Sequence, residues 1–403
     1  MTEPDRPAPG AMSARRRRTR DQVLDVLDRH PAVTRADLSR LTGLSPSAVS
    51  DAVAALIASG QVTERSAGRA AGRGRRPAVL TRPDVEGVVV GIDLGHAHVT
   101  AAVATTSGKV LVECSRALDV DHRPEQALDL AAGLAREALG QAGHAAADAL
   151  GIAAGIPGPL DVRTQVVRAP SILADWVGRA PAAELSERLG HPVIVGNDAD
   201  MGARGEQAFG AAQGLDDFLY IKASHGIGAG IVLSGATYRG STGIAGEIGH
   251  TQLPGATSWC RCGSQGCLET VVSIGAVRRQ LAHVLSTAAS SVDEDSLPPL
   301  VELARDPAAA RVITDAGRTV GRVVADLVNC LNPAAVILGG ELGAAGEPFA
   351  AGVRESVDRY AQPAGAEAVD VLSGRLGTRA ELLGTIAVAV PTRRGATFPG
   401  PAA

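Results

Sequence analysis

The spacing of apolar residues near the N-terminus predicts three short helices. Apolar side chains at positions 23, 24, 26 and 27 give a first helix one hydrophobic face, from about Asp21 to before Pro31. Thr34 and Asp37 form a capping-box-like pair that starts a second helix, which ends at a turn containing Gly43. This tight turn before a third helix predicts a helix-turn-helix arrangement.

The third predicted helix supplies candidate contacts with DNA. Ser45 is placed to cap it, Pro46 takes its first position, and apolar residues at 49, 53, 56 and 57 recur until Gly60. In a helix-turn-helix, the first residues of this last helix face the bases in the major groove. Ser47 and Ser50 lie early on the helix and away from its apolar face. The candidate contacts from this helix are therefore Ser45, Ser47 and Ser50.

Two short predicted strands after this helix flank an arginine-rich loop. Residues 61–64 and 78–80 have strand character, and the loop between them is basic near its tip. Arginines on such a wing reach phosphates or a narrow minor groove. The candidate contacts from the wing are Arg69, Arg73, Arg75 and Arg76. A small helical interaction module with a basic linker is the alternative interpretation of this segment.

Charge divides the chain into two parts of opposite sign. Residues 1–82 carry 15 Lys+Arg and 8 Asp+Glu, a net charge of +7, and the remainder carries −11. A basic head on an acidic body is typical of a DNA-contacting module fused to a ligand-binding or enzymatic body. The Pro- and Ala-rich start and the arginine run that follows predict a flexible basic arm over residues 1–19. The winged helix-turn-helix is expected over residues 20–82.

Length and composition limit the class of protein. A chain of 403 residues that is 45% hydrophobic has the size and apolar content for two or three packed domains. The apolar stretches are short and interrupted, and no apolar segment of a signal peptide follows the N-terminal arginines. We therefore expect a cytoplasmic protein that has no membrane partner.

Runs of buried-strand character that end in glycine turns dominate the rest of the chain. Residues 88–92 and 99–104 predict a hairpin around Asp93 and Gly95. An Asp-x-Gly turn of this kind places a carboxylate near a metal-bound nucleotide and lets backbone amides approach phosphate. Further strands ending in turns are predicted within residues 150–159, 193–200, 220–233 and 335–340. Such strands are consistent with two related lobes around a cleft.

Three of the five cysteines cluster with a histidine. His250, Cys260, Cys262 and Cys267 provide one imidazole and three thiolates, a donor set that suits a closed tetrahedral structural zinc site. A redox pair and chance clustering are the alternatives. The remaining cysteines, Cys114 and Cys330, are expected to be small buried hydrophobic residues.

Five motifs in this order resemble the ROK family of sugar kinases and sugar-responsive repressors: GIPGPL, NDAD, GIGAGIVL, AGEIGH and CRCGSQGCLE. The GRGRRP segment of the wing resembles the winged modules of ROK repressors. The resemblance covers residues 87–390 of the body. It implies an α/β protein in which a winged helix-turn-helix precedes a two-lobed actin-like ATPase (ribonuclease H-like) sugar-kinase fold. It also implies a homodimer or homotetramer.

The expected domains follow from this resemblance. The small lobe is placed at residues 87–196 and is joined by a C-terminal helix at 378–391. The large lobe, with the zinc loop, is placed at residues 197–377. A flexible tail is expected at residues 392–403.

The resemblance also implies a sugar site. Asn197, Asp198, Glu247, His250 and Glu269 match family positions that bind sugar hydroxyls. Family kinases usually carry Asn within the segment that corresponds to residues 169–172, where this chain has Ala-Pro-Ser-Ile, so Ser171 is a candidate replacement. His250 has two roles, because one ring nitrogen can bind zinc while the other faces a hydroxyl.

The phosphate loops depart from the kinase pattern. Family kinases have Asp-x-Gly-Gly-Thr and Gly-Thr-Gly-Ile-Gly, whereas this chain carries His96, Ala97 and His98 in the first loop and His225 in the second. Bulky rings there obstruct the backbone amides that stabilise a transferring phosphoryl group. We therefore expect neither ATP nor Mg²⁺ as a cofactor. The vestigial nucleotide-side residues are Asp93, Gly95, Gly226, Gly228, Gly339 and Gly340.

The combined prediction is a repressor that binds double-stranded operator DNA and senses a small sugar or phosphosugar. The alternative is an ATP-dependent hexose or N-acetylhexosamine kinase with an accessory DNA-binding domain, in which Asp198 is the catalytic base. A zinc-stabilised scaffold whose cleft binds nothing is a third interpretation.

Overall fold

The computed structural model describes residues 18–27, 30, 33–65, 78–81, 86–168, 173–286 and 293–391. The chain divides into an N-terminal unit up to Val85 and a body that starts at Glu86. Among the described helices, none is by itself long and apolar enough to cross a membrane. The bent pair Arg35–Thr42 and Pro46–Ala58 meets the length and composition test only when taken together.

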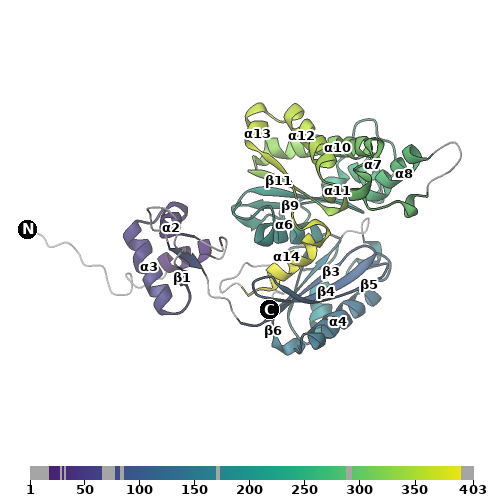
Figure 1. The fold of residues 1–403 in the computed structure, drawn as a ribbon. Helices are drawn as coiled ribbons and strands as arrows, with labels where there is room; N and C mark the ends of the chain where they lie inside the picture. The colour runs from purple at the N-terminus through teal and green to yellow at the C-terminus, as the bar shows by residue number, and fades with distance from the viewer. Residues whose placement is uncertain are drawn as a thin grey trace, which may run out of the picture. The chain divides into compact units, whose positions relative to one another are not determined.

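The N-terminal unit contains three helices and a two-stranded sheet (Figure 1). Residues 18–27 are helical, so the first helix includes two positions that the sequence placed in the arm. Helices α2 (Arg35–Thr42) and α3 (Pro46–Ala58) follow, with their axes bent by 117°. This angle lies in the range of a helix-turn-helix. The strands β1 (Thr63–Arg65) and β2 (Val79–Thr81) pair antiparallel.

Local sequence determines where these helices start and stop. The Thr34 side chain accepts a hydrogen bond from the Asp37 backbone, and the Asp37 carboxylate accepts one from Thr34 in return, so the predicted capping box is present. Gly43 ends α2 with a φ of +68°, which a glycine adopts without strain. Ser45 caps α3 by accepting from the Ala48 backbone N–H. The small core of this unit consists of Val23, Leu24, Val26, Leu27, Val33, Leu38, Val49, Ala52, Val53, Leu56, Val62 and Leu80.

The first lobe of the body is built on a five-stranded sheet with the order β5-β4-β3-β6-β7. The β3–β4 and β4–β5 pairs are antiparallel, and β6 and β7 add parallel to β3. Helices α4 (Pro124–Gln141) and α5 (Pro181–Leu189) pack with this sheet. Its strands are β3 (Val88–Leu94), β4 (His98–Thr105), β5 (Val110–Ala117), β6 (Ala149–Ile156) and β7 (Val193–Asn197).

The second lobe contains another five-stranded sheet, with the order β10-β9-β8-β11-β12. Its strands are β8 (Phe218–Ala223), β9 (Ile227–Leu233), β10 (Ala236–Thr237), β11 (Ala335–Gly339) and β12 (Asp370–Ser373). Its longest helices, α10 (Pro307–Leu331) and α12 (Glu347–Tyr360), pack against each other. The other helices are α7 (Leu268–Val272), α8 (Ile274–Leu285), α9 (Leu300–Leu303), α11 (Gly340–Ala344) and α13 (Pro363–Ala368).

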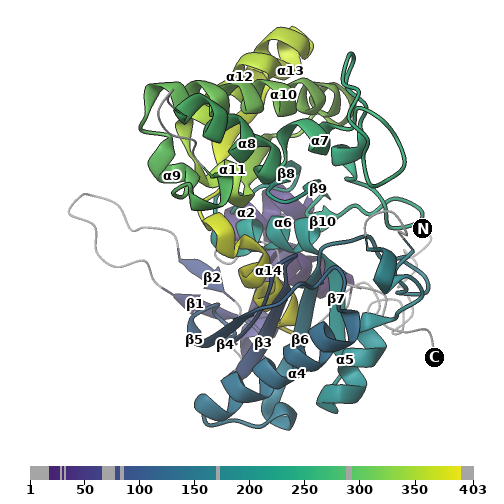
Figure 2. The ribbon, with the colours of Figure 1, turned by 90° about the vertical axis from the view of Figure 1, so that its right-hand side faces the viewer.

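Two helices lie between the sheets and join the lobes (Figures 1 and 2). Helix α6 (Asp198–Phe209) starts directly after β7 of the first sheet and packs on β8 and β9 of the second. Helix α14 (Ala380–Ala389) packs on β3 and β6 and also against α6. The start of α6 is therefore held at the junction of the two lobes, where the cleft residues gather.

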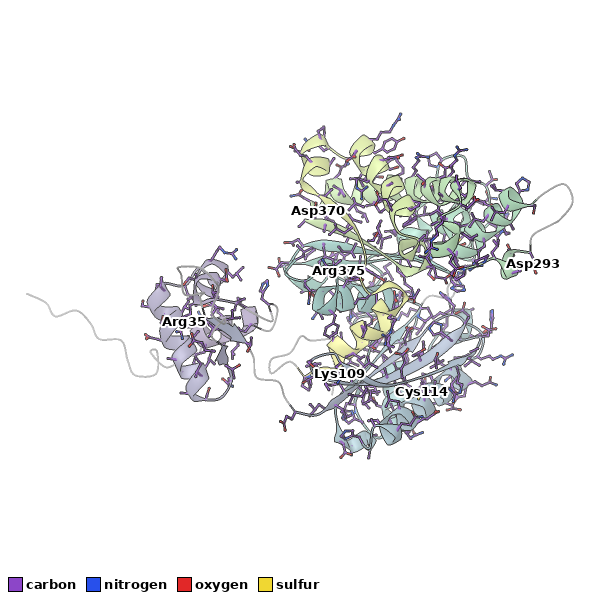
Figure 3. The ribbon with its side chains drawn as sticks, in the orientation of Figure 1. Arg35, Lys109, Cys114, Asp293, Asp370 and Arg375 are labelled. Atoms are coloured by element: carbon purple, nitrogen blue, oxygen red, sulfur yellow. The ribbon has the colours of Figure 1, made fainter. Side chains whose placement is uncertain are left out.

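The cysteines outside the metal cluster differ in burial. Cys114 on β5 is buried, as the sequence predicted (Figure 3). The same prediction is wrong for Cys330, which is exposed near the end of α10. The buried face of this helix carries Val324 and Val328, and a residue two positions after Val328 points about 200° away from it.

The close crossing of α6 and α14 depends on glycine. A Cβ on Gly384 would overlap the carbonyl oxygen of Met201 in α6, whereas a Cβ on Gly133 in the exposed middle of α4 meets nothing within 4 Å. We expect Gly384→Ala to lower the free energy of unfolding by about 1–3 kcal/mol through overpacking. Gly133→Ala is expected to raise it by roughly 0.5–1 kcal/mol, because alanine is the better helix former.

Urea unfolding followed by tryptophan fluorescence measures both effects, since Trp176 and Trp259 are the only tryptophans and both lie in the body. Equal unfolding midpoints for Gly384→Ala and the unchanged protein would contradict the close crossing.

Candidate ligand cleft and metal centre

The four predicted metal ligands lie together. The ligand atoms of His250, Cys260, Cys262 and Cys267 are all within 4.8 Å of one another. The sulfurs of Cys262 and Cys267 are 3.6 Å apart, and the Cys260 sulfur is 3.6 Å from Nδ1 of His250. In a tetrahedral zinc site with Zn–S bonds of about 2.3 Å, neighbouring sulfurs lie about 3.8 Å apart. The donor set and its spacing can therefore hold a tetrahedral metal ion.

The loop that carries the cysteines is folded by short backbone pairings. Isolated bridges join Gln252 to Cys267 and Trp259 to Gln265. Gly266 has a φ of +76°, and a Cβ there would overlap the carbonyl oxygen of Ala256. Only glycine fits this position without moving the loop.

The metal group borders the cleft through His250. While Nδ1 of His250 faces Cys260, its Nε2 lies 3.8 Å from a carboxylate oxygen of Glu247. Cys267 directly precedes α7, which carries Glu269, and the Cys260 thiol donates to Glu269 at 3.1 Å. A metal ion at this group would therefore fix the orientation of His250 and the position of Glu269.

The residues predicted to bind sugar line one cavity of about 50 Å³, with the exception of Ser171, which lies outside the described residues. The cavity lining contains Asn197, Asp198, Glu247, His250 and Glu269. Asn197 ends β7 and caps α6, because its Oδ1 accepts from the Ala199 and Asp200 backbones. Its side-chain amide nitrogen remains as a donor in a cavity that is lined by the carboxylates of Asp198, Glu247 and Glu269 and by basic side chains.

The ionised form of Glu247 is disfavoured by its surroundings. Burial and the neighbouring carboxylates of Asp198, Glu269 and Asp200 raise the pKa of Glu247 to about 7. The carboxylates of this cavity can accept hydrogen bonds from ligand hydroxyls, and its amide and basic groups can donate to them.

The sequence did not predict the role of Lys222. This residue near the end of β8 lines the cavity, and its ammonium lies 2.5 Å from Oδ2 of Asp198. The other oxygen of Asp198 accepts from the Ala199 backbone at 2.7 Å. Each carboxylate oxygen of the candidate base therefore already accepts one hydrogen bond from the protein. No motif drew attention to Lys222, although it is the one charged residue in the apolar run of β8.

Imidazoles occupy the side of the cleft where the sequence predicts the phosphate loops. The rings of His96 and His225 have centroids 5.6 Å apart, and His96 Nδ1 lies 2.8 Å from Asp121. Burial and the nearby His96 lower the pKa of His225, which keeps its ring neutral. With Arg261 and Trp259, these residues line a second cavity of about 310 Å³.

The glycines assigned to the nucleotide side are mostly covered. The His98 ring lies against Gly95 where a Cβ would stand, and His98 Nε2 is 3.0 Å from Oδ2 of Asp93. Gly339 packs on the Tyr220 ring, and Gly340 packs on the Ala223 carbonyl with a φ of +71°. Close helix and strand packing therefore accounts for these glycines.

Two glycines of the second phosphate loop are less enclosed. Gly226 precedes β9 and faces Glu269 and Arg261 at ordinary contact distance. Gly228, inside β9, lies against Ala199 in α6. Both line the smaller cavity, so this loop borders the residues predicted to bind sugar.

The candidate DNA contacts on α3 are exposed. Ser45, Ser47 and Ser50 are all at the surface of the N-terminal unit, and the hydroxyls of Ser45 and Ser47 are 3.1 Å apart. The observed β1 and β2 begin one or two residues later than the predicted strands 61–64 and 78–80. The wing residues Arg69, Arg73, Arg75 and Arg76 lie outside the described residues.

Glu381 in α14 makes the stability of the body depend on pH. Burial raises its pKa to about 7, although the Lys222 ammonium acts against this shift. The folded protein therefore keeps a proton that the unfolded chain releases near its ordinary pKa of 4.5. Glu381 stabilises the fold fully below about pH 4.5, and this contribution is lost as the pH rises through about 7.

Glu381→Gln is expected to remove this contribution. Between about pH 4.5 and 7, the free energy of unfolding should then fall with pH less steeply, by up to roughly 1.4 kcal/mol per pH unit. The amide keeps an acceptor for the Tyr220 hydroxyl, which donates to Glu381 at 3.0 Å. Urea unfolding of both proteins at several pH values between 5 and 8 measures the two slopes. Parallel slopes would show that Glu381 does not titrate in this range.

Comparisons with known proteins cover both units. A model of the ROK family matches residues 89–391, and a model of the MarR family matches residues 22–74. The chain is 31% identical over 382 residues to a putative xylose repressor of Caldicellulosiruptor sp. (strain Rt8B.4). This match covers 91% of this chain and 94% of that protein.

Two solved structures are similar to the chain. One is a ROK family transcriptional regulator described as a homologue of the E. coli MLC protein, with a TM-score of 0.69, 26% identity and coverage of 94% and 96% of the two chains. The other is a ROK family glucokinase of Streptomyces griseus, in complex with glucose and AMPPNP. It has a TM-score of 0.64 and 30% identity, and it covers 75% of this chain and 99% of that one.

These matches confirm the predicted fold class, in which a winged helix-turn-helix precedes an actin-type sugar-kinase body. The chain belongs to the ROK family.

Proposed function

We propose that this protein is a transcriptional repressor whose affinity for operator DNA changes when a sugar binds in the cleft of its body. The observation that carries the proposal is the asymmetry of the cleft. Acceptors for sugar hydroxyls line one cavity, whereas the side where a kinase holds phosphate carries the imidazoles of His96 and His225 and the pair of Asp93 with His98.

The N-terminal unit supports the DNA-binding part of the proposal. The start of α3 presents Ser45, Ser47 and Ser50 to solvent, as a recognition helix requires. The arginines of the wing would contact phosphates, and the net charge of +7 over residues 1–82 favours double-stranded DNA. Relatives across nearly the whole chain are named xylose repressors, which supports the same role.

The cleft supports the sugar-binding part. In this proposal Asn197, Asp198, Glu247, His250 and Glu269 contact ligand hydroxyls, and Ser171 takes the place of the asparagine found in family kinases. A zinc ion held by His250 and the three cysteines of the cluster has a structural role. It fixes the second nitrogen of His250 toward the sugar.

Coupling between the sites requires that the sugar bind the DNA-incompetent conformation more tightly. A homodimer or homotetramer would present two recognition helices to a palindromic operator, and a sugar that closes the cleft would change their spacing. We place this activity in the cytoplasm. A typical coupling of about 1–3 kcal/mol corresponds to a roughly 5- to 150-fold change in operator affinity.

The test is fluorescence anisotropy of the full chain on its own upstream DNA at fixed salt, with a panel of sugars and phosphosugars. One member of the panel is expected to weaken sequence-specific binding by the factor just given. Unchanged affinity at saturation with every member would contradict the proposed coupling.

A pair of charge-matched variants tests the DNA contact itself. Ser50→Glu is expected to abolish specific binding, because it places a negative charge beside the phosphates. Ser107→Glu adds the same charge to an exposed turn of the body and should leave the affinity unchanged. Equal affinities of the two variants would rule out α3 as the recognition helix.

A sugar kinase with an accessory DNA-binding domain is the second candidate. Asp198 is present, and the glucokinase relative from Streptomyces griseus shares 30% identity with the chain. Hexose-dependent release of ADP in a coupled assay, without sugar-sensitive DNA binding, would favour it.

A further inference from the structure

Lys222 is an unusual residue in this chain. The sequence contains only two lysines against 37 arginines. Lys109 is exposed in the turn before β5 (Figure 3), whereas the Lys222 side chain is 15% exposed in the cleft. A compact ammonium, in place of a planar guanidinium, behaves as a point charge that several oxygens can surround.

The Lys222 ammonium contacts Asp198, and the charges of two further carboxylates from separate elements, Asp93 and Glu381, also act on it. Asp198 starts α6 and lies 2.5 Å from Lys222 Nζ, Asp93 comes from β3, and Glu381 comes from α14. All three carboxylate residues are at most 8% exposed. Burial acts to lower the pKa of Lys222, but the charges of Asp198, Glu381 and Asp93 outweigh it and raise the pKa above its ordinary value. Lys222 therefore remains charged.

Each carboxylate also has a partner from the chain itself. Asp198 pairs with Lys222, and Oδ2 of Asp93 lies 3.0 Å from Nε2 of His98. Glu381 accepts a hydrogen bond from the Tyr220 hydroxyl at 3.0 Å. The hydrogen bond to Asp93 is the main cause that raises the pKa of His98, which favours its cationic form. The Lys222 ammonium, joined by the His98 ring when it is protonated, thus offsets negative charge in this carboxylate cluster.

A magnesium-dependent phosphoryl transfer needs the opposite arrangement. Mg²⁺ takes carboxylate, water and phosphate oxygens in a near-octahedral shell, and it neutralises charge between the phosphates. A carboxylate already bonded to an ammonium cannot offer the same lone pair to a metal ion. The positive charge of Lys222, joined by that of His98 when it is protonated, also repels a second cation.

We propose that Lys222 is a built-in cation that replaces a divalent metal ion among Asp93, Asp198 and Glu381, so that the cleft binds its ligand without Mg²⁺ or nucleotide. Lys222 holds Asp198 in one orientation, with a lone pair on each oxygen left for ligand hydroxyls. It is a positioning residue and a charge substitute. This inference deepens the proposed function, yet its test requires neither operator nor effector, so the two can fail separately.

The test is Mn²⁺ binding to the zinc-loaded full chain, measured by electron paramagnetic resonance. Lys222→Met removes the ammonium and keeps much of the side-chain volume. It is expected to create a Mn²⁺ site in the cleft and to bind Mn²⁺ roughly tenfold or more tightly than the unchanged protein. Lys222→Arg keeps the charge and should not gain the site. Lys109→Met removes the other lysine and should behave as the unchanged protein does.

A double variant locates the new site. Lys222→Met combined with Asp198→Asn should lose the Mn²⁺ affinity gained by Lys222→Met alone, because a carboxylate ligand is removed. Equal Mn²⁺ affinities for Lys222→Met, Lys109→Met and the unchanged protein would overturn the inference.

A measurement on the protein that retains Lys222 tests the inference even if Lys222→Met fails to fold. The protein with Lys222 in place is expected to show no Mn²⁺ signal that depends on Asp198. A Mn²⁺ site that is present with Lys222 in place and disappears in Asp198→Asn would overturn the proposal.

Discussion

Cys267→Ser is expected to release the bound metal and to abolish the response to sugar while operator binding persists. Cys267 is fully buried and forms the N-terminal boundary of α7, the helix that carries Glu269. A serine hydroxyl does not replace a thiolate as a zinc ligand. Loss of the metal therefore frees both His250 and Glu269, two of the five described sugar contacts that we propose.

The size of this effect follows from the role of the metal as an orienting group. Mutating the outer partners of metal ligands typically costs about 10- to 100-fold in metal affinity or activity, and we expect a loss of sugar affinity of about the same size. Metal analysis is expected to give one zinc per chain before the change and less than one after it. Sugar titrations by calorimetry and operator binding by anisotropy give the other two readouts.

Cys330→Ser is the matched control, because it makes the same substitution at an exposed cysteine outside the cluster. It should retain zinc, sugar binding and operator binding. Retention of full sugar affinity by a zinc-free Cys267→Ser protein would separate the metal from the cleft and refute its proposed orienting role.

The sequence predicted those parts of the structure that are formed by residues close together in the chain. The capping box of Thr34 and Asp37 and the Ser45 cap require only neighbouring residues, and both are present in the structure. The metal group also has short spacing, since Cys260, Cys262 and Cys267 lie on one loop with fixed turns. Family motifs supplied the cleft residues and the two-lobed body.

The residues that the sequence missed are those whose role depends on distant packing. Lys222 meets Asp198 only because α6 packs on β8, and Glu381 joins them only because the C-terminal helix α14 lies between the lobes. The error at Cys330 has a related cause. A preference of cysteine for burial cannot show which face of α10 meets the core.

Glu247→Gln is expected to weaken sugar binding more than any other single conservative change in the cleft. The carboxylate of Glu247 lines the cavity and has Asp198, Glu269 and Asp200 as negative neighbours. Ligand hydroxyls that donate to it would relieve this repulsion, and a hydrogen bond to a charged group contributes about 1.5–3 kcal/mol. An amide of the same shape offers one acceptor and introduces a donor that faces other donors.

The expected loss is therefore roughly 10- to 150-fold in sugar affinity at pH 8, where Glu247, with a pKa of about 7, is mostly ionised. The ionised form of Glu247 is the better hydrogen-bond acceptor, so sugar affinity is expected to rise with the fraction of Glu247 that is ionised. Affinity of the unchanged protein should fall as the pH is lowered from 8 to 6, while Glu247→Gln stays weak throughout. Calorimetric titration with the sugar identified in the operator assay measures both curves.

Glu302→Gln, at an exposed position of α9, is the control that makes the same substitution away from the cleft. It should leave sugar affinity and its pH dependence unchanged. Zinc content and operator affinity should remain at their original values in both variants, which separates a lost contact from a damaged fold. Equal sugar affinities of Glu247→Gln and Glu302→Gln at pH 8 would remove Glu247 from the sugar site. The ligand would then have to be held by Asn197, Asp198 and Glu269, because these are the remaining carboxylate and amide groups among the proposed contacts.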